Sequence, residues 1–196
     1  MLSVDGRVAR GQRSRGAVAE ALMELLREGD ARPTAARVAE RAGVSLRLVH
    51  HHFKDREALF VAAMDRQREH LQPYVQPVPM DRPFSERLGT FVKNRALLLE
   101  VMGPVRRAGL AEEPHSPVVH ASLSTIRAIK RNQVRQVFEP ELAARSGAVR
   151  ADLLAAACTA ASWSAWEELR SYQGLSVTRA RRVMKRALST LFAHFE

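Results

Sequence analysis

Residues 34–53 of this chain are TAARVAERAGVSLRLVHHHF, and the order of their side chains predicts a helix-turn-helix. Ala39 has to be small, because the second helix of such a motif crosses close to it. Gly43 falls at the turn, where a positive φ is often needed. Ser45 is a good N-cap for a second helix through His52. The N-terminus of that second helix would be free to face phosphates or base edges.

Three consecutive histidines, His50, His51 and His52, end the predicted second helix. Adjacent residues on a helix point about 100° apart, so these imidazoles cannot converge on one metal ion. Metal-binding helices place their ligands three or four residues apart, and only Asp55 stands in that relation to these histidines. We therefore expect no metal site here. Instead, we predict that His50 and His51 face DNA and that His52 turns inward near Phe53.

The composition of the 196-residue chain favours a nucleic-acid partner. Lys and Arg number 31 against 21 Asp and Glu, a net charge of +10. This excess suits nucleic acid first and an acidic membrane surface second. The only cysteine, Cys158, permits no internal disulfide, which fits a reducing, cytoplasmic setting. Residues 1–16 lack the apolar core of a secretory signal, and the longest apolar run, around 153–161, is too short to span a bilayer.

Apolar residues recur with the 3.6-residue period of a helix along the whole chain, and strand-like alternation is nearly absent. The predicted fold is therefore all-α, with about nine helices. The predicted helices cover residues 14–27, 34–42, 45–52, 84–102, 116–138, 150–172 and 176–195, and a further helix begins near residue 55. Four prolines within residues 73–83 predict a linker, because a continuous helix cannot accommodate them.

The helix-turn-helix region resembles the DNA-binding region of TetR/AcrR-family transcriptional regulators. The matching positions are Thr34, Val38–Ala39, Ala42–Gly43–Val44–Ser45, Val49, His52–Phe53, Arg56–Glu57 and Leu59, within about the first third of the chain. Three positions depart from the family pattern, which usually has tyrosine at His50 and often has glycine at Arg47 and lysine at Arg56. Histidine can still contact a phosphate, and a guanidinium can replace the lysine there.

The resemblance implies a set of DNA-contacting residues on this chain. An arginine at position 47 could bind guanine through two hydrogen bonds, and Leu46 or Leu48 could touch a thymine methyl group. The basic residues before the first helix could reach a backbone or a minor groove. The predicted DNA-binding residues are Arg13, Arg15, Thr34, Ser45, Leu46, Arg47, Leu48, His50, His51, Lys54 and Arg56.

The resemblance also implies a domain division and a dimer. We predict a DNA-binding domain over residues 1–54 and an effector-binding and dimerisation domain over 55–196, in which 55–72 form a connecting helix and 73–83 the linker. The last two helices fit a dimer interface, because small residues allow close helix approach. The predicted interface residues are Leu153, Ala157, Ala160, Trp166, Met184, Leu188 and Leu191. The alternative is that they form the chain's own core.

A family member would bind a small effector between the helices of the second domain. The predicted pocket residues are Phe91, Arg95, Leu98, Met102 and Trp163, of which the first four lie on one stripe of a helix. A cation within an apolar stripe needs a partner, so Arg95 favours an anionic or amphipathic effector. It could instead extend to water or pair with a glutamate, and Trp163 could simply be core.

The expected function is therefore that of a homodimeric DNA-binding regulator, a repressor that a small effector releases from a near-palindromic operator. We do not expect an enzyme, because no nucleophile–base pair, paired carboxylates or phosphate loop is evident, and we expect no cofactor. The alternative is a ligand-independent, architectural DNA-binding protein with steep salt dependence. Residues 73–196 hold seven of the ten net positive charges, which DNA binding by the N-terminal domain does not explain. The final helix is crowded by Arg179, Arg181, Arg182, Lys185 and Arg186, which suits either an acidic membrane surface or, more commonly, a solvated face.

Overall fold

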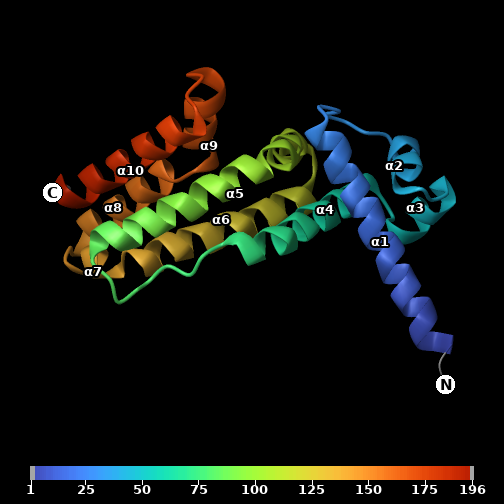
Figure 1. The fold of residues 1–196 in the computed structure, drawn as a ribbon, viewed down its shortest axis with the longest axis horizontal. Coiled ribbons are helices and arrows are strands. Elements are labelled where there is room, and N and C mark those ends of the chain that lie inside the picture. Colours follow the sequence, from blue (N-terminus) through green and yellow to red (C-terminus); the bar gives the residue numbers. More distant parts are fainter. Residues whose placement is uncertain (1–2, 195–196) are drawn as a thin grey trace. The chain divides into compact units, whose positions relative to one another are not determined.

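The computed structural model describes residues 3–194, which form ten α-helices and no strand (Figure 1). The α-helices are α1 (Ser3–Arg27), α2 (Ala35–Ala42), α3 (Leu46–His52), α4 (Arg56–Leu71), α5 (Phe84–Glu112), α6 (Pro117–Val137), α7 (Glu139–Ala143), α8 (Gly147–Ala160), α9 (Trp163–Glu167) and α10 (Val177–His194). Two 3-10 turns, Gln72–Tyr74 and Glu113–His115, and one π-helical turn, Glu168–Tyr172, accompany them. The predicted all-α fold is confirmed. Residue 195, included in the last predicted helix, lies outside the described residues.

The helices form two compact units. The first unit contains the chain up to Pro73 together with Met102–Ser124, and the second contains Tyr74–Val101 together with the chain from Thr125. This division differs from the predicted boundary after residue 54, because α4 packs against α1. The Phe60 ring of α4 is buried and lies 3.2 Å from where a Cβ on Gly109 of α5 would stand. Helix α4 is thus part of the core of the first unit.

Helix α1 is longer than predicted, since it begins at Ser3 rather than near residue 14. Its extra turns are rich in arginine, a good helix former, and no proline precedes residue 33 to interrupt them. The C-terminal half carries the apolar face, with Val18, Leu22 and Leu26 buried in the first unit. The N-terminal half extends beyond α2, α3 and α4 (Figure 1). The basic residues before residue 14 therefore lie on a helix.

Two further boundaries differ from the predicted ones. Helix α5 continues through Pro104 to Glu112 instead of ending near residue 102. A proline removes only one helical hydrogen bond, and burial of Leu99 and Val105 on either side stabilises the continuous helix. The helix predicted over 150–172 is broken after Ala160, where Ser162 caps α9 by accepting a hydrogen bond from the Ala165 N–H (3.1 Å).

The second unit has its own apolar core. Phe84, Phe91 and Phe192 surround Phe138, with ring centroids 4.6–5.9 Å from that of Phe138. Helices α8 and α10 pack against each other. The side chain of Asn94 on α5 fixes the linker, because its amide accepts a hydrogen bond from the Gln76 N–H (3.2 Å) and donates one to the Gln76 carbonyl (2.6 Å). Across residues 3–194, no helix is both long and apolar enough to cross a membrane.

The turn between α2 and α3 generates a stability prediction. Gly43→Ala should lower the free energy of unfolding by about 1 kcal/mol, because φ at Gly43 is +65°, a conformation that strains L residues. Gly16→Ala within α1 is the matched control, since neither Cβ would meet an atom within 4 Å. The control should raise that free energy by about 0.5–1 kcal/mol. Denaturant unfolding followed by circular dichroism measures both, and a stabilising Gly43→Ala would contradict the left-handed turn.

Candidate nucleic-acid interface

Both helices of the helix-turn-helix begin at the predicted cap residues. The Thr34 hydroxyl accepts a hydrogen bond from the Arg37 N–H (3.3 Å) at the start of α2. The Ser45 hydroxyl accepts one from the Leu48 N–H (3.2 Å) at the start of α3. Between the two helices, Gly43 supplies the left-handed residue that ends α2. The local sequence thus fixes where α3 starts and in which direction its N-terminus points.

Buried apolar side chains fix the face that α3 turns outward. Val38 and Ala39 of α2 are buried, as are Val49 of α3 and Phe53 at its C-cap. Helix α3 packs against both α1 and α2. Because Val49 faces this core, residues on the other side of α3 must face away from it.

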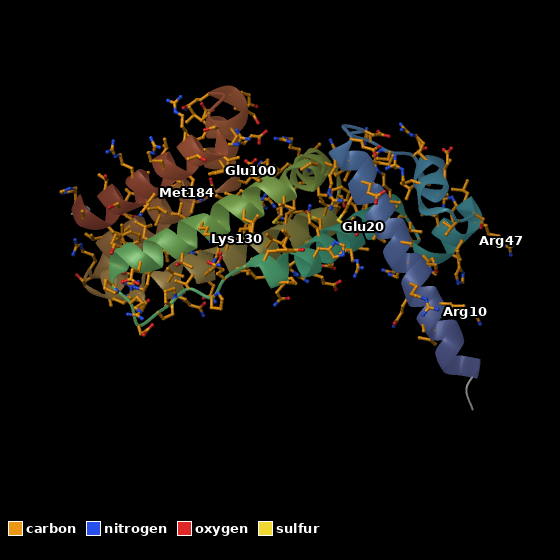
Figure 2. The ribbon with its side chains drawn as sticks, in the orientation of Figure 1. Arg10, Glu20, Arg47, Glu100, Lys130 and Met184 are labelled. Atoms are coloured by element: carbon orange, nitrogen blue, oxygen red, sulfur yellow. The ribbon has the colours of Figure 1, made fainter. Side chains whose placement is uncertain are left out.

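The outward face of α3 holds most of the predicted DNA-contacting residues. Ser45, Leu46, Arg47, His50 and His51 are exposed, and Leu48 is half-buried. Leu46 is 42% exposed, which leaves it available for an apolar contact. Arg47 lies at the outer edge of α3 (Figure 2) and has no hydrogen-bond or ion-pair partner in the described part of the chain. The helix therefore presents a free guanidinium between apolar side chains.

His52 turns inward, as predicted, and ties α3 to α1. Its Nε2 and the Ser14 hydroxyl are hydrogen-bonded at 2.6 Å. Arg15 donates a hydrogen bond to the His52 carbonyl (2.8 Å), and its guanidinium lies 4.5 Å from the centre of the Phe53 ring. Three neighbouring contacts thus hold the C-terminal end of α3 on α1. We call Ser14, Arg15 and His52 the α1–α3 clasp.

The clasp favours a neutral His52. Burial lowers the pKa of the His52 imidazole below its ordinary value of 6.5, and the nearby His51 and Arg15 lower it further. His52 is therefore neutral at physiological pH. Within residues 3–194, no group of three His, Cys, Asp or Glu side chains could hold a metal ion.

The basic residues of α1 form a straight extension of the interface. Arg10 and Arg13 are exposed, and neither forms an ion pair with a carboxylate of the described residues. Arg10 lies on the part of α1 that extends beyond the other helices (Figure 2). A helix with its side chains is about 10–12 Å wide and the minor groove is about 6 Å wide, so a helical segment suits the phosphate backbone better than this groove. The geometry therefore favours phosphate contacts by these arginines.

Two other predicted DNA-contacting residues have partners within the protein. Arg15 belongs to the α1–α3 clasp, and Arg56 pairs with Glu112 (3.3 Å), which also pairs with Arg32 (3.2 Å). Lys54 is different, because its side chain is 80% exposed and its ion pair with Asp55 is long (3.6 Å). Lys54 is therefore freer than Arg15 or Arg56 to reach a phosphate.

The residues predicted to line an effector pocket lie on and around α5. Phe91 and Arg95 are buried, with the guanidinium 4.9 Å from the centre of the Phe91 ring. Arg95 donates a hydrogen bond to the Gln133 side chain (3.2 Å) but forms no ion pair with a carboxylate of residues 3–194. Burial lowers the pKa of Arg95 to about 10, so it stays charged at neutral pH. Trp163 is also buried, Leu98 and Met102 are half-buried, and Met102 falls in the first unit.

Most residues predicted at the dimer interface pack inside the single chain. Leu153, Ala157, Trp166, Met184 and Leu188 are each at most 1% exposed, and Ala160 and Leu191 are half-buried. Trp166 also donates its indole N–H to Glu100 (2.7 Å). A partner chain could therefore touch Ala160, Leu191 and exposed neighbours of the buried residues on α8 and α10.

Sequence patterns did not indicate one residue of the interface, Ser14. It contributes to the clasp, but 38 residues separate it from His52, and no periodicity connects them. Arg10 was among the basic residues expected to reach a backbone or a minor groove, but it was not expected to lie on a helix. The recurrence of arginine at positions 7, 10 and 13 is the signal that could have indicated a shared face.

Comparison with known proteins gives one family match and two similar folds. Residues 18–63 match the family described as bacterial regulatory proteins, tetR family. The fold is similar to a transcriptional regulator from Rhodococcus sp. Rha1, with a TM-score of 0.72 and 16% identity over 91% of this chain and 96% of that one. It is also similar to a protein from Pseudomonas aeruginosa PAO1 with a proposed role in transcriptional regulation, with a TM-score of 0.66 and 18% identity over 94% and 95% of the two chains. No curated protein matches by sequence.

The α1–α3 clasp predicts a pH dependence of stability. Because the pKa of His52 is lower in the folded chain, the unfolded chain binds a proton more readily as the pH falls below about 6.5. The urea midpoint should therefore drop between about pH 7.5 and about pH 5.5, and His52→Gln should make this drop smaller. His50→Gln, at an exposed position of the same helix, is the control and should leave the drop unchanged. Identical pH profiles for wild type and His52→Gln would contradict the clasp.

Proposed function

We propose that this chain is a DNA-binding transcriptional regulator of the tetR family, and that it acts in the cytoplasm as a homodimeric repressor, which a small effector releases from a near-palindromic operator. The observation that carries the proposal is the outward face of α3, where Arg47 lies unpaired between exposed apolar residues while His52 holds the helix on α1. A helix supported in this way can enter a major groove as a rigid body.

The contacts with DNA would differ in kind along the interface. Arg47 would bind guanine through two hydrogen bonds, and Leu46 would contact a thymine methyl group. Lys54, Arg10 and Arg13 would hold phosphates and so set the position of the protein on the duplex. The base contacts would supply sequence preference, and the phosphate contacts would supply salt-dependent affinity.

A symmetric dimer would present two copies of α3 to one face of the duplex. The outer face of α8 supports this arrangement, because Ala148, Ala151, Ala155 and Thr159 are exposed and uncharged. An exposed helix face usually carries charge, so an uncharged face of small residues suits close packing against a second helix. The two α3 helices would then lie roughly 34–36 Å apart, or a multiple of that distance.

The effector would be bound by the second unit. Arg95 supports an anionic or amphipathic compound, because it is a buried cation whose described partners are an amide and an aromatic ring. Burying a charge without a counter-charge is costly, and an anionic ligand would remove that cost. The effector would have to bind more tightly to the conformation that does not fit the operator.

Sequence preference is expected to depend on Arg47. On the duplex that the wild-type protein binds best, Arg47→Ala should remove about 1–3 kcal/mol of discrimination at one base pair of each half-site. Lys54→Ala is the matched control and should weaken binding to all duplexes and reduce the salt slope by about one. Fluorescence anisotropy with duplexes exchanged at that base pair measures both effects. Equal weakening on every duplex by Arg47→Ala would place its guanidinium on a phosphate instead.

Dimerisation is expected to depend on the outer face of α8. Ala155→Glu should raise the dimer dissociation constant by about tenfold or more, because the charge would lose water at the interface. Sedimentation velocity should give twice the 21.9 kDa chain mass for the wild type and a larger monomer fraction for the variant. Ala144→Glu, which adds the same charge at an exposed position outside α8, controls for net charge. An unchanged dissociation constant for Ala155→Glu would exclude this face from the interface.

A further inference from the structure

A groove in the second unit lies between α5 and α10, and it contains part of the basic cluster of the final helix. Its volume is about 420 Å³, within the size range of small-molecule sites. Lys93 of α5 lines one side, and Arg181, Arg182 and Lys185 of α10 line the other. The groove therefore combines four cations with a concave shape.

These four cations are not neutralised by the protein. None of them forms an ion pair with a carboxylate among residues 3–194, and the described partner of Lys93 Nζ is the Gln76 side-chain oxygen at 3.4 Å. Elsewhere in the same unit, Arg150 pairs with Glu139 (2.8 Å) and Arg170 pairs with Glu100 (2.7 Å). Like charges gathered without counter-charges repel one another, so the groove is electrostatically suited to a multiply charged anion.

The shape of the groove leaves room for such an anion. Gly89 lines it, and a Cβ at that position would meet nothing within 4 Å. Thr178 adds a hydroxyl that can donate a hydrogen bond. Two guanidinium groups offer the forked donors that match phosphate oxygens, and the lysines add point charges.

We propose that the groove between α5 and α10 binds a small ligand carrying two or more linked phosphate groups. Four cations match the charge of a di- or triphosphate better than that of a single carboxylate. The groove is concave and lies between two helices, which favours a compact ligand. A membrane or a duplex would need a broad surface without such a recess. This site is separate from Arg95 and from α3, so it goes beyond the proposed effector and DNA contacts.

The test uses the full chain and inorganic triphosphate as the probe, in isothermal titration calorimetry at about 0.15 M salt. We expect saturable binding that Arg181→Gln with Lys185→Gln weakens by about tenfold or more. The matched control is Arg179→Gln with Arg186→Gln, which removes the same charge from the same helix outside the groove. The control should change the affinity less than about twofold. Because all four positions are exposed, both variants should fold, which circular dichroism checks.

Each other outcome would overturn the proposal. Equal loss in the two double variants would show a diffuse charge effect, and the absence of saturable binding would show that no site exists. Groove-dependent binding to phosphatidylserine vesicles without triphosphate binding would indicate a membrane surface. Affinity for the preferred duplex, measured in the same variants, should be unchanged, and its loss would make the groove a DNA contact. The Arg47→Ala result is independent of all these outcomes, so the two proposals can fail separately.

Discussion

The position of α3 on α1 is the constraint on which the proposed DNA-binding surface depends. Helix α3 has only seven residues, too few for a stable helix by itself in water. Its N-terminal end is fixed by the Ser45 cap, and its C-terminal end by the hydrogen bonds of His52 with Ser14 and Arg15. With both ends held and Val49 buried between them, the outward residues have one direction in which to point. Base recognition requires that fixed direction, because hydrogen bonds to base edges tolerate little misplacement.

Some charged residues of the first unit are paired with one another and others are unpaired. Glu24 and Glu28 of the α1 region pair with Arg41 of α2 at 3.4 and 2.7 Å, and Asp30 pairs with Arg37 at 2.6 Å. The hydrogen bonds between Arg41 and Glu28 lower the pKa of that carboxyl group. These pairs join α1 and the turn after it to α2, and they neutralise Arg37 and Arg41 although both residues are exposed. The unpaired arginine of α3 and those of the α1 extension then account for the local excess of positive charge.

The sequence allowed prediction of features that depend on neighbouring residues. Thr34, Gly43 and Ser45 act within three or four residues of their own positions, so their spacing was sufficient to predict the turn and both caps. Features set by distant packing were less predictable. The passage of α5 through Pro104 depends on burial along the whole helix, and the clasp between Ser14 and His52 joins separate helices. Apolar periodicity also identified Leu153 and Met184 as interior residues, but it could not distinguish the chain's own core from a dimer interface.

We propose that α3 binds specific DNA sequences as one half of a symmetric pair. The decisive experiment is selection of binding sites from random duplex DNA by the purified full chain at near-physiological salt. We expect an enriched, two-fold symmetric motif whose half-sites are centred about one helical turn of DNA, or a multiple of it, apart. The absence of an enriched motif, together with binding that vanishes as salt rises, would contradict it and indicate an architectural DNA-binding protein.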